Sequence, residues 1–167
     1  QYPQIISEQT AYQITSLLEG AIKRGTGRKL RSLNIPLAGK TGTTNKNMDT
    51  WFIGYTSKLV VGVFVGFDEP KTLGRYETGA KTALPIFKNF IKKTVKKGDA
   101  MPFKVPKGIS FVMVDPDKGV SKELNYNKAI YESFKTSNLK NIYSGNFLNE
   151  KNQLYGSINT EKIFSFY

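Results

Sequence analysis

Apolar residues recur at helical spacing near the start of the chain. Ser7 is placed to cap a helix, and Gly25 and Gly27 are placed to end it. The apolar positions between them recur at the i, i+3, i+4 and i+7 spacing of one helix face: Ala11, Ile14, Leu17, Leu18, Ala21 and Ile22. This pattern predicts an amphipathic helix that packs one face on a core.

A second helical pattern follows residue 82. Thr82 is a candidate N-cap, Pro85 is tolerated in the first turn, and Gly98 is expected to end the helix. The predicted apolar stripe consists of Ile86, Phe87, Phe90, Ile91 and Val95. Five lysines lie mainly on its polar side, which is therefore basic: Lys88, Lys92, Lys93, Lys96 and Lys97.

The segment between the two helices reads as β-structure. Residues 33–44 contain one strand, and residues 50–56 and 59–67 are rich in aromatic and β-branched side chains. Only Ser57-Lys58 separates the last two segments, which predicts a tight antiparallel hairpin. Glycines inside these strands indicate bulges or close backbone packing, at Gly54, Gly62 and Gly66. The predicted fold class is α+β, a partial antiparallel sheet with helices packed on it.

The rest of the chain is more polar. Residues 99–119 form an extended linker, a short strand at 109–114 and a turn at 115–119. Residues 120–167 form a third segment rich in Asn, Lys and Tyr. Five apolar residues there are candidates for packing, namely Phe147, Leu148, Ile163, Phe164 and Phe166. We therefore expect three segments, 1–98, 99–119 and 120–167.

The net charge of +12 also suits a non-enzymatic function. Such a chain can be a basic binding module for nucleic acid or an anionic polymer. However, 21 lysines and only 4 arginines are spread along the sequence, whereas phosphate-reading surfaces favour clustered arginine. A basic stripe interleaved with exposed aromatics on one sheet face would favour this alternative. Burial of four aromatic residues would count against it: Trp51, Phe52, Phe64 and Phe67.

The chain contains no cysteine and no histidine. Structural disulfides, Cys/His metal sites and a Ser-His-Asp triad are therefore excluded. We expect no metal and no cofactor. The longest apolar stretch, residues 59–67, is too short to span a membrane.

The most informative motif is Lys40-Thr41-Gly42-Thr43-Thr44. Lys-Thr-Gly closes the active site of penicillin-reactive serine enzymes. A bare Lys-Thr-Gly arises by chance in roughly one sequence in six of this composition, but two further threonines reduce that to about one in a thousand.

The chemistry of this motif is that of a peptide-binding strand. A strand edge accepts a substrate peptide as an added strand, and Gly42 lets the substrate backbone approach. Because successive side chains of a strand point to opposite faces, the hydroxyls of Thr41 and Thr43 lie on one face, where they can hold a terminal carboxylate. Lys40 lies on the other face and supplies positive potential beside the site. The N–H of Thr43 is a candidate oxyanion donor.

No convincing serine nucleophile accompanies the motif. Ser137-Asn138-Leu139-Lys140 matches Ser-x-x-Lys, but about one such match is expected by chance in this composition. Ser-x-Asn also occurs, at residues 32–34, 144–146 and 157–159. We interpret these matches as coincidental.

Residues 36–68 resemble the C-terminal end of the transpeptidase domain of class A penicillin-binding proteins. Three blocks with family-like spacing carry the resemblance: residues 38–45 (AGKTGTTN), 49–56 (DTWFIGYT) and 63–68 (VFVGFD). Gly25-Thr26-Gly27 is similar to an upstream family motif, and residues 79–87 are similar to the family's final helix and its approach. The resemblance implies that residues 1–98 are the C-terminal portion of such a domain, with a serine β-lactamase/transpeptidase-like fold.

The resemblance also implies a function. The parent protein would be a peptidoglycan-crosslinking D,D-transpeptidase, and also a glycosyltransferase, that forms an acyl-enzyme with D-Ala-D-Ala stem peptides or β-lactams. Lys40, Thr41, Gly42 and Thr43 would bind substrate, and Asp49 and Trp51 would be structural.

In that family, Ser-x-x-Lys and Ser-x-Asn precede Lys-Thr-Gly, so we expect the nucleophile upstream of Gln1 and no activity from this chain alone. Its partners would be the missing upstream part of the domain and the stem peptide or β-lactam, with no nucleic acid. An N-terminal anchor outside the chain would hold the parent at the periplasmic face of the bacterial inner membrane. A serine β-lactamase-like fragment fits less well, because of the Trp-Phe-x-Gly-Tyr block and the long tail.

Overall fold

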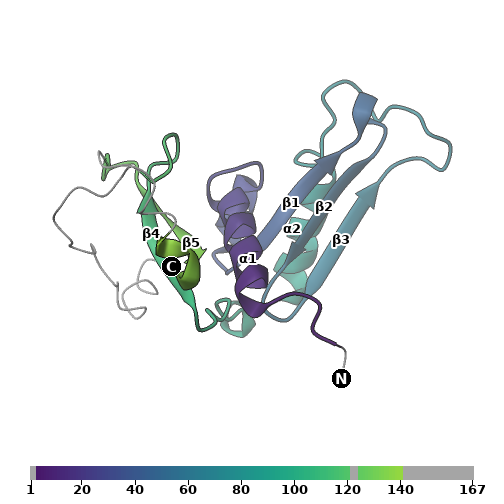
Figure 1. Ribbon diagram of the computed structural model, residues 1–167. Coiled ribbons are helices and arrows are strands. Elements are labelled where there is room, and N and C mark those ends of the chain that lie inside the picture. The colour runs from purple at the N-terminus through teal and green to yellow at the C-terminus, as the bar shows by residue number, and fades with distance from the viewer. Residues whose placement is uncertain (1–2, 121–123, 141–167) are drawn as a thin grey trace. The chain divides into compact units, whose positions relative to one another are not determined.

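The computed structural model describes residues 3–120 and 124–140. These residues form two compact units, one built from residues before 15 and after 104, the other from Thr15–Lys104. Helix α1 (Glu8–Lys23) contributes its first half to the first unit and its second half to the second unit. Figure 1 labels the α-helices and strands of both units.

Helix α1 begins and ends where the sequence predicts. The Ser7 hydroxyl accepts a hydrogen bond from the N–H of Thr10 at 3.2 Å, as an N-cap does. After Lys23, the N–H groups of Gly25 and Gly27 both donate to the carbonyl of Ala21. A Cβ on Gly25 would lie 2.8 Å from that carbonyl oxygen, so a glycine is needed there.

The second unit contains a three-stranded antiparallel sheet in the order β1-β2-β3. The strands are β1 (Ala38–Thr43), β2 (Thr50–Tyr55) and β3 (Val60–Val65), preceded by the 3-10 helix η1 (Arg28–Leu33). In the β2–β3 turn, the N–H of Thr56 donates to the carbonyl of Leu59, and the Thr56 hydroxyl accepts from the N–H of Leu59. The predicted hairpin is confirmed.

The glycines in this hairpin do not mark bulges. Pairing between β2 and β3 runs without interruption from Thr50↔Val65 to Tyr55↔Val60, so of the two predicted alternatives, bulges or close packing, only close packing is found. Gly66 follows β3, and a Cβ there would lie 2.5 Å from both the Asp49 carboxylate and the Phe64 ring. Gly54 is needed for close packing, because a Cβ there would lie 2.7 Å from the Phe52 ring and 2.8 Å from the Phe87 ring. Gly62 meets only a side-chain atom of Ile53 at 3.9 Å, so its position is open.

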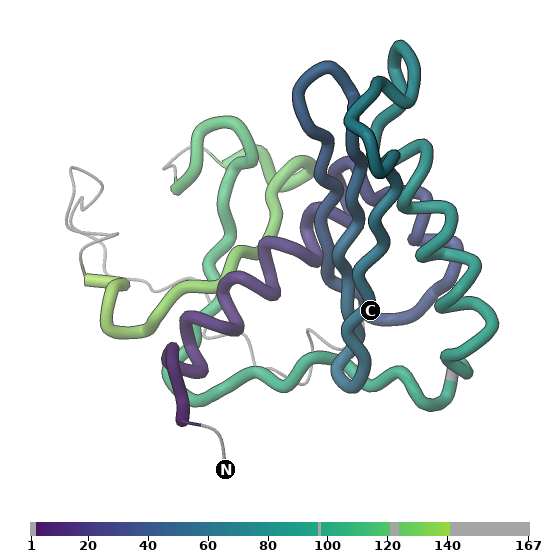
Figure 2. Tube along the Cα trace, turned by 90° about the vertical axis from the view of Figure 1, so that its right-hand side faces the viewer, coloured from purple at the N-terminus to yellow at the C-terminus, as the bar shows by residue number. Residues whose placement is uncertain are grey.

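Helix α2 (Ala83–Thr94) lies on one face of this sheet (Figures 1 and 2). The ring of Phe87 packs on that of Phe52 with centroids 4.6 Å apart, and both side chains are fully buried. The helix buries four residues on that face: Ala83, Leu84, Phe87 and Ile91. These positions recur at i, i+1, i+4 and i+8, which is one helical face.

The predicted apolar stripe of α2 is therefore partly wrong. Ile86 and Phe90 are about half exposed, because they lie one residue before the buried positions and turn to the side of the helix. The helix also ends at Thr94, and Val95 is already extended, so Gly98 does not end it. Gly98 lies instead in the short 3-10 helix η3 (Lys97–Asp99).

Thr82 does not cap α2. Its side chain makes no capping hydrogen bond, and its backbone has φ −106° and ψ −67°. The hydroxyl instead donates to the carbonyl of Thr78 at 3.0 Å and lies 2.6 Å from the buried hydroxyl of Thr50. The Thr82 hydroxyl thus joins the turn before α2 to the sheet and does not cap the helix.

The first unit contains a two-stranded antiparallel sheet of β4 (Ile109–Val114) and β5 (Ile130–Lys135). Strand β4 and the turn after it are as predicted, and the Asp115 carboxylate accepts hydrogen bonds from the N–H groups of Asp117 and Lys118. Strand β5 was not predicted. The 3-10 helix η4 (Thr136–Asn138) follows it.

The first half of α1 lies against this small sheet. The side-chain amide of Gln9 donates to the carbonyl of Lys107 at 2.7 Å, and that of Gln13 to the carbonyl of Ser133 at 3.1 Å. The five apolar residues between 147 and 166 that were candidates for packing lie outside the described residues. Among the residues that are described, no helix combines the length and apolarity that a membrane span requires.

Candidate functional site

Strand β1 presents one backbone edge that β2 does not occupy. Among the described residues it pairs with β2 alone, in the register Ala38↔Tyr55 to Thr43↔Thr50. The N–H of Thr44 donates to the carbonyl of Asp49 at 3.0 Å, so residues 44, 42, 40 and 38 point their backbone groups toward β2. The alternate residues Gly39, Thr41 and Thr43 therefore direct N–H and C=O to the opposite edge. An extended peptide can pair with such an edge.

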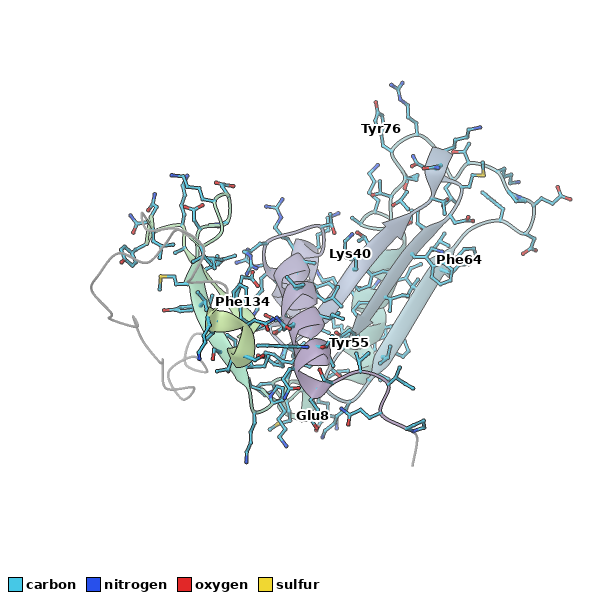
Figure 3. The ribbon with its side chains drawn as sticks, viewed as in Figure 1. Glu8, Lys40, Tyr55, Phe64, Tyr76 and Phe134 are labelled. Atoms are coloured by element: carbon cyan, nitrogen blue, oxygen red, sulfur yellow. The ribbon has the colours of Figure 1, made fainter. Side chains whose placement is uncertain are left out.

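Lys40 and Thr41 come together at this edge. The register places Lys40 opposite Ile53 on the exposed sheet face, and Thr41 opposite buried Phe52 on the face that α2 covers. The Lys40 amine nevertheless bends over the edge, because it donates to the Thr41 carbonyl at 3.0 Å and lies 3.3 Å from the Thr41 hydroxyl. Lys40 is marked in Figure 3. A positive charge thus lies beside the first threonine of the motif.

The two threonine hydroxyls have partners that sequence reasoning missed. Thr41 Oγ1 lies 2.9 Å from Thr26 Oγ1, and Thr43 Oγ1 accepts the N–H of Gly79 at 3.1 Å. Thr26 belongs to the Gly-Thr-Gly segment, whose resemblance to the family was the only signal for it. Nothing local in the sequence connects Gly79 to Thr43, which is 36 residues earlier.

The connection after β1 is held by its own hydrogen bonds. The Thr44 hydroxyl accepts the N–H of Asp49 at 2.8 Å and donates to the Asp49 carbonyl at 3.2 Å. Asn47 links this turn to the loop after β3, because its carbonyl accepts the N–H of Leu73 and its side-chain amide donates to the carbonyl of Gly74. Tyr76 marks the outer end of that loop in Figure 3. Hydrogen bonds of the β1–β2 connection and of the loop after β3 thus hold the end of β1 in place.

The exposed face of the sheet is aromatic but not basic. Of the four aromatic residues whose burial would count against a basic binding module, only Phe52 is fully buried, whereas Trp51, Phe64 and Phe67 are 41%, 50% and 44% exposed. Trp51 packs on Phe64 with ring centroids 4.8 Å apart. Among the three strands, Lys40 is the only basic residue on this face, so the face lacks the stripe that an anionic polymer would require.

The two described Ser matches have local roles. Ser137 lies in η4, and its exposed hydroxyl donates to the side chain of Asn138. The Ser32 hydroxyl donates to the carbonyl of Lys29 in η1, and Asn34 ends that helix with φ 52°. The other two Ser-x-Asn matches, at 144–146 and 157–159, lie outside the described residues.

Comparisons with known proteins agree with these observations. The family model of the penicillin binding protein transpeptidase domain matches residues 3–92. The chain is similar to penicillin-binding protein 1A of Rickettsia prowazekii, with 46% identity over 136 residues, covering 81% of this chain and 17% of that protein. It is also similar to penicillin-binding protein 1A of Pseudomonas aeruginosa, with 46% identity over 132 residues, covering 78% of this chain and 16% of that protein. The chain thus spans less than a fifth of the length of these relatives.

A solved structure is also similar to this chain. The crystal structure of penicillin-binding protein 1A from Haemophilus influenzae matches with a TM-score of 0.69 and 29% identity, over 90% of this chain and 22% of that one. The α+β prediction is confirmed, and the resemblance seen in residues 36–68 is confirmed over a longer range. The chain belongs to the penicillin-binding protein transpeptidase domain family.

Proposed function

We propose that this chain forms one wall of the active site of a peptidoglycan-crosslinking D,D-transpeptidase. An extended stem peptide ending in D-Ala-D-Ala would pair with the outer edge of β1 as an added strand. The observation that carries the proposal is the outward direction of the backbone groups of Thr41 and Thr43 in a Lys-Thr-Gly strand.

Each motif residue has a role in this proposal. Lys40 and the hydroxyls of Thr41 and Thr43 bind the terminal carboxylate, and the N–H of Thr43 stabilises the oxyanion of the tetrahedral intermediate. Gly42 lets the substrate backbone approach the strand, and Trp51 leaves little room for a side chain at this position, because a Cβ there would lie 3.2 Å from the Trp51 side chain. A β-lactam would bind in the same way, since its carboxylate and strained amide mimic the peptide end.

The nucleophile belongs to another part of the proposed site. Residues 3–92, which match the family, contain no Ser-x-x-Lys. We therefore propose that a serine outside this chain attacks the peptide carbonyl, that D-alanine leaves, and that an amine of a second strand takes the acyl group. The same upstream part would carry a membrane anchor at the periplasmic face of the inner membrane. By itself, the chain would be inactive.

The test is the rate of acylation by a penicillin. The gene product is expressed with every residue that its gene encodes, and Lys40→Ala and Thr41→Val are compared with wild type. We expect each variant to react at least about tenfold more slowly, because a pre-aligned donor to the reacting ligand is lost. Lys58→Ala is the matched control, because Lys58 is an exposed lysine in the β2–β3 turn. Equal rates for all four proteins would refute the proposal.

A further inference from the structure

A short turn before α2 crosses the sheet beside the motif. The N–H groups of Lys81 and Thr82 both donate to the carbonyl of Thr78, and the N–H of Leu84 donates to the carbonyl of Gly79. The hydroxyl contact between Thr82 and Thr50 fastens the turn to β2 at 2.6 Å. The position of Gly79 over the sheet is therefore fixed by hydrogen bonds on both sides.

Gly79 lies directly on the backbone of β1 and β2. A Cβ added there would meet the carbonyl oxygen of Trp51, would lie 2.6 Å from the carbonyl oxygen of Gly42, and would lie 3.3 Å from the Gly42 nitrogen. These are backbone atoms that cannot rotate away, so only glycine permits this approach. The close approach brings the N–H of Gly79 within 3.1 Å of Thr43 Oγ1.

This hydrogen bond determines what the Thr43 hydroxyl can do. A backbone N–H only donates, so the Thr43 oxygen must be the acceptor. Its own proton then points elsewhere and remains available to an acceptor on a ligand. A carboxylate oxygen is such an acceptor, and hydrogen bonds to charged acceptors are the stronger ones.

We propose that Gly79 is a positioning residue that presents the Thr43 hydroxyl as a hydrogen-bond donor to the ligand carboxylate. The proposal rests on the proposed function for the identity of the ligand. The hydrogen bond itself does not depend on that function, so the two parts are tested separately.

The first experiment measures hydrogen exchange of the Gly79 amide by NMR in this chain alone. Thr43→Val removes the acceptor at constant shape, and Thr43→Ser keeps it. We expect the Gly79 amide to exchange about three- to tenfold faster in Thr43→Val, which corresponds to one lost hydrogen bond, and at the wild-type rate in Thr43→Ser. Equal exchange in all three proteins would show that Thr43 does not hold Gly79 and would overturn the proposal.

The second experiment measures acylation by a penicillin and by its methyl ester, which lacks the carboxylate. In the full gene product, glycolic acid is incorporated in place of Gly79. The amide bond between Thr78 and Gly79 then becomes an ester, so the N–H is replaced by an oxygen and no atom is added that would clash. We expect the rate with the free carboxylate to fall about three- to tenfold and the rate with the ester to stay the same. Gly62→Ala is the control, because a Cβ there meets only one atom at 3.9 Å.

The outcomes separate the two proposals. An equal fall with both ligands would show that Gly79 acts only on the fold, and an unchanged rate with both would show no role, so either result overturns the positioning proposal. If the wild-type gene product reacts with neither ligand, the proposed function is refuted and the carboxylate assignment falls with it. The exchange experiment still decides whether Gly79 holds Thr43.

Discussion

The Thr50–Thr82 contact gives a sharp test of how α2 is joined to the sheet. The Thr82 hydroxyl has one proton and donates it to the carbonyl of Thr78, so the Thr50 hydroxyl must donate to Thr82. Thr50 is fully buried, whereas the Thr78 carbonyl also accepts two backbone N–H groups. Removing the Thr82 hydroxyl therefore leaves a buried hydroxyl without a partner, whereas removing the Thr50 hydroxyl does not.

Replacing each threonine by valine keeps the shape and deletes the hydroxyl. Thr82→Val leaves the Thr50 hydroxyl buried without a partner, which costs about 1–3 kcal/mol in the free energy of unfolding. Thr50→Val leaves Thr82 bonded to Thr78 and buries a methyl group in place of a hydroxyl, so it costs less than about 1 kcal/mol. The double variant leaves no buried hydroxyl unpaired, and we expect it to be more stable than Thr82→Val alone.

Urea unfolding of this chain measures these free energies, with fluorescence of Trp51, the single tryptophan, as the probe. If Thr82 acted as an ordinary N-cap, its replacement would cost about 1 kcal/mol whether or not Thr50 were present, and the two effects would add. Additive effects, or a Thr50→Val variant as unstable as Thr82→Val, would refute the reasoning.

Three further predictions concern stability. Gly54→Ala forces a methyl group into the Phe52 and Phe87 rings and should cost about 1–3 kcal/mol by urea unfolding. The Asp115 carboxylate accepts hydrogen bonds from two backbone N–H groups of its turn, which lower its pKa. The ionised carboxylate therefore stabilises the fold at pH values above the ordinary pKa of about 3.9. This contribution is lost as the pH falls through the lowered value, and Asp115→Asn should remove that part of the pH profile. Burial raises the pKa of Glu19 above its ordinary value of about 4.3, against the opposing effect of the nearby Lys23. Glu19→Gln should therefore be more stable than wild type at pH 7, and the difference should shrink as the pH falls through the raised pKa and vanish below the ordinary value.

The elements that were predicted correctly have strong local signals. Strands β2 and β3 are dense in β-branched and aromatic residues and are joined by a two-residue polar break, so their pairing follows from local chemistry. The start of α1 follows from Ser7, and its end from two glycines whose N–H groups close the last turn. The motif strand was recognised because five residues in a row agree with one family pattern.

The features that were missed depend on contacts between distant residues. Threonine is a common N-cap residue, but the Thr82 hydroxyl bonds to the Thr50 hydroxyl of the sheet instead of to the first N–H groups of α2. Strand β5 lies in a polar segment, and its partner β4 lies about twenty residues earlier. Thr26 and Gly79 reach the motif only through the folded chain, so their roles beside Thr41 and Thr43 have no local signature.

The most direct test of the account is to locate the serine that a fluorescent penicillin acylates. The gene product, expressed with every residue that its gene encodes, is labelled, digested and examined by mass spectrometry, and residues 1–167 alone are labelled in parallel. We expect one acylated serine outside residues 1–167, slower labelling when Thr41 and Thr43 are replaced by valine, and no labelling of the chain alone. Stoichiometric labelling of Ser137, or no labelling of the gene product, would contradict the claim that β1 is one wall of a transpeptidase site.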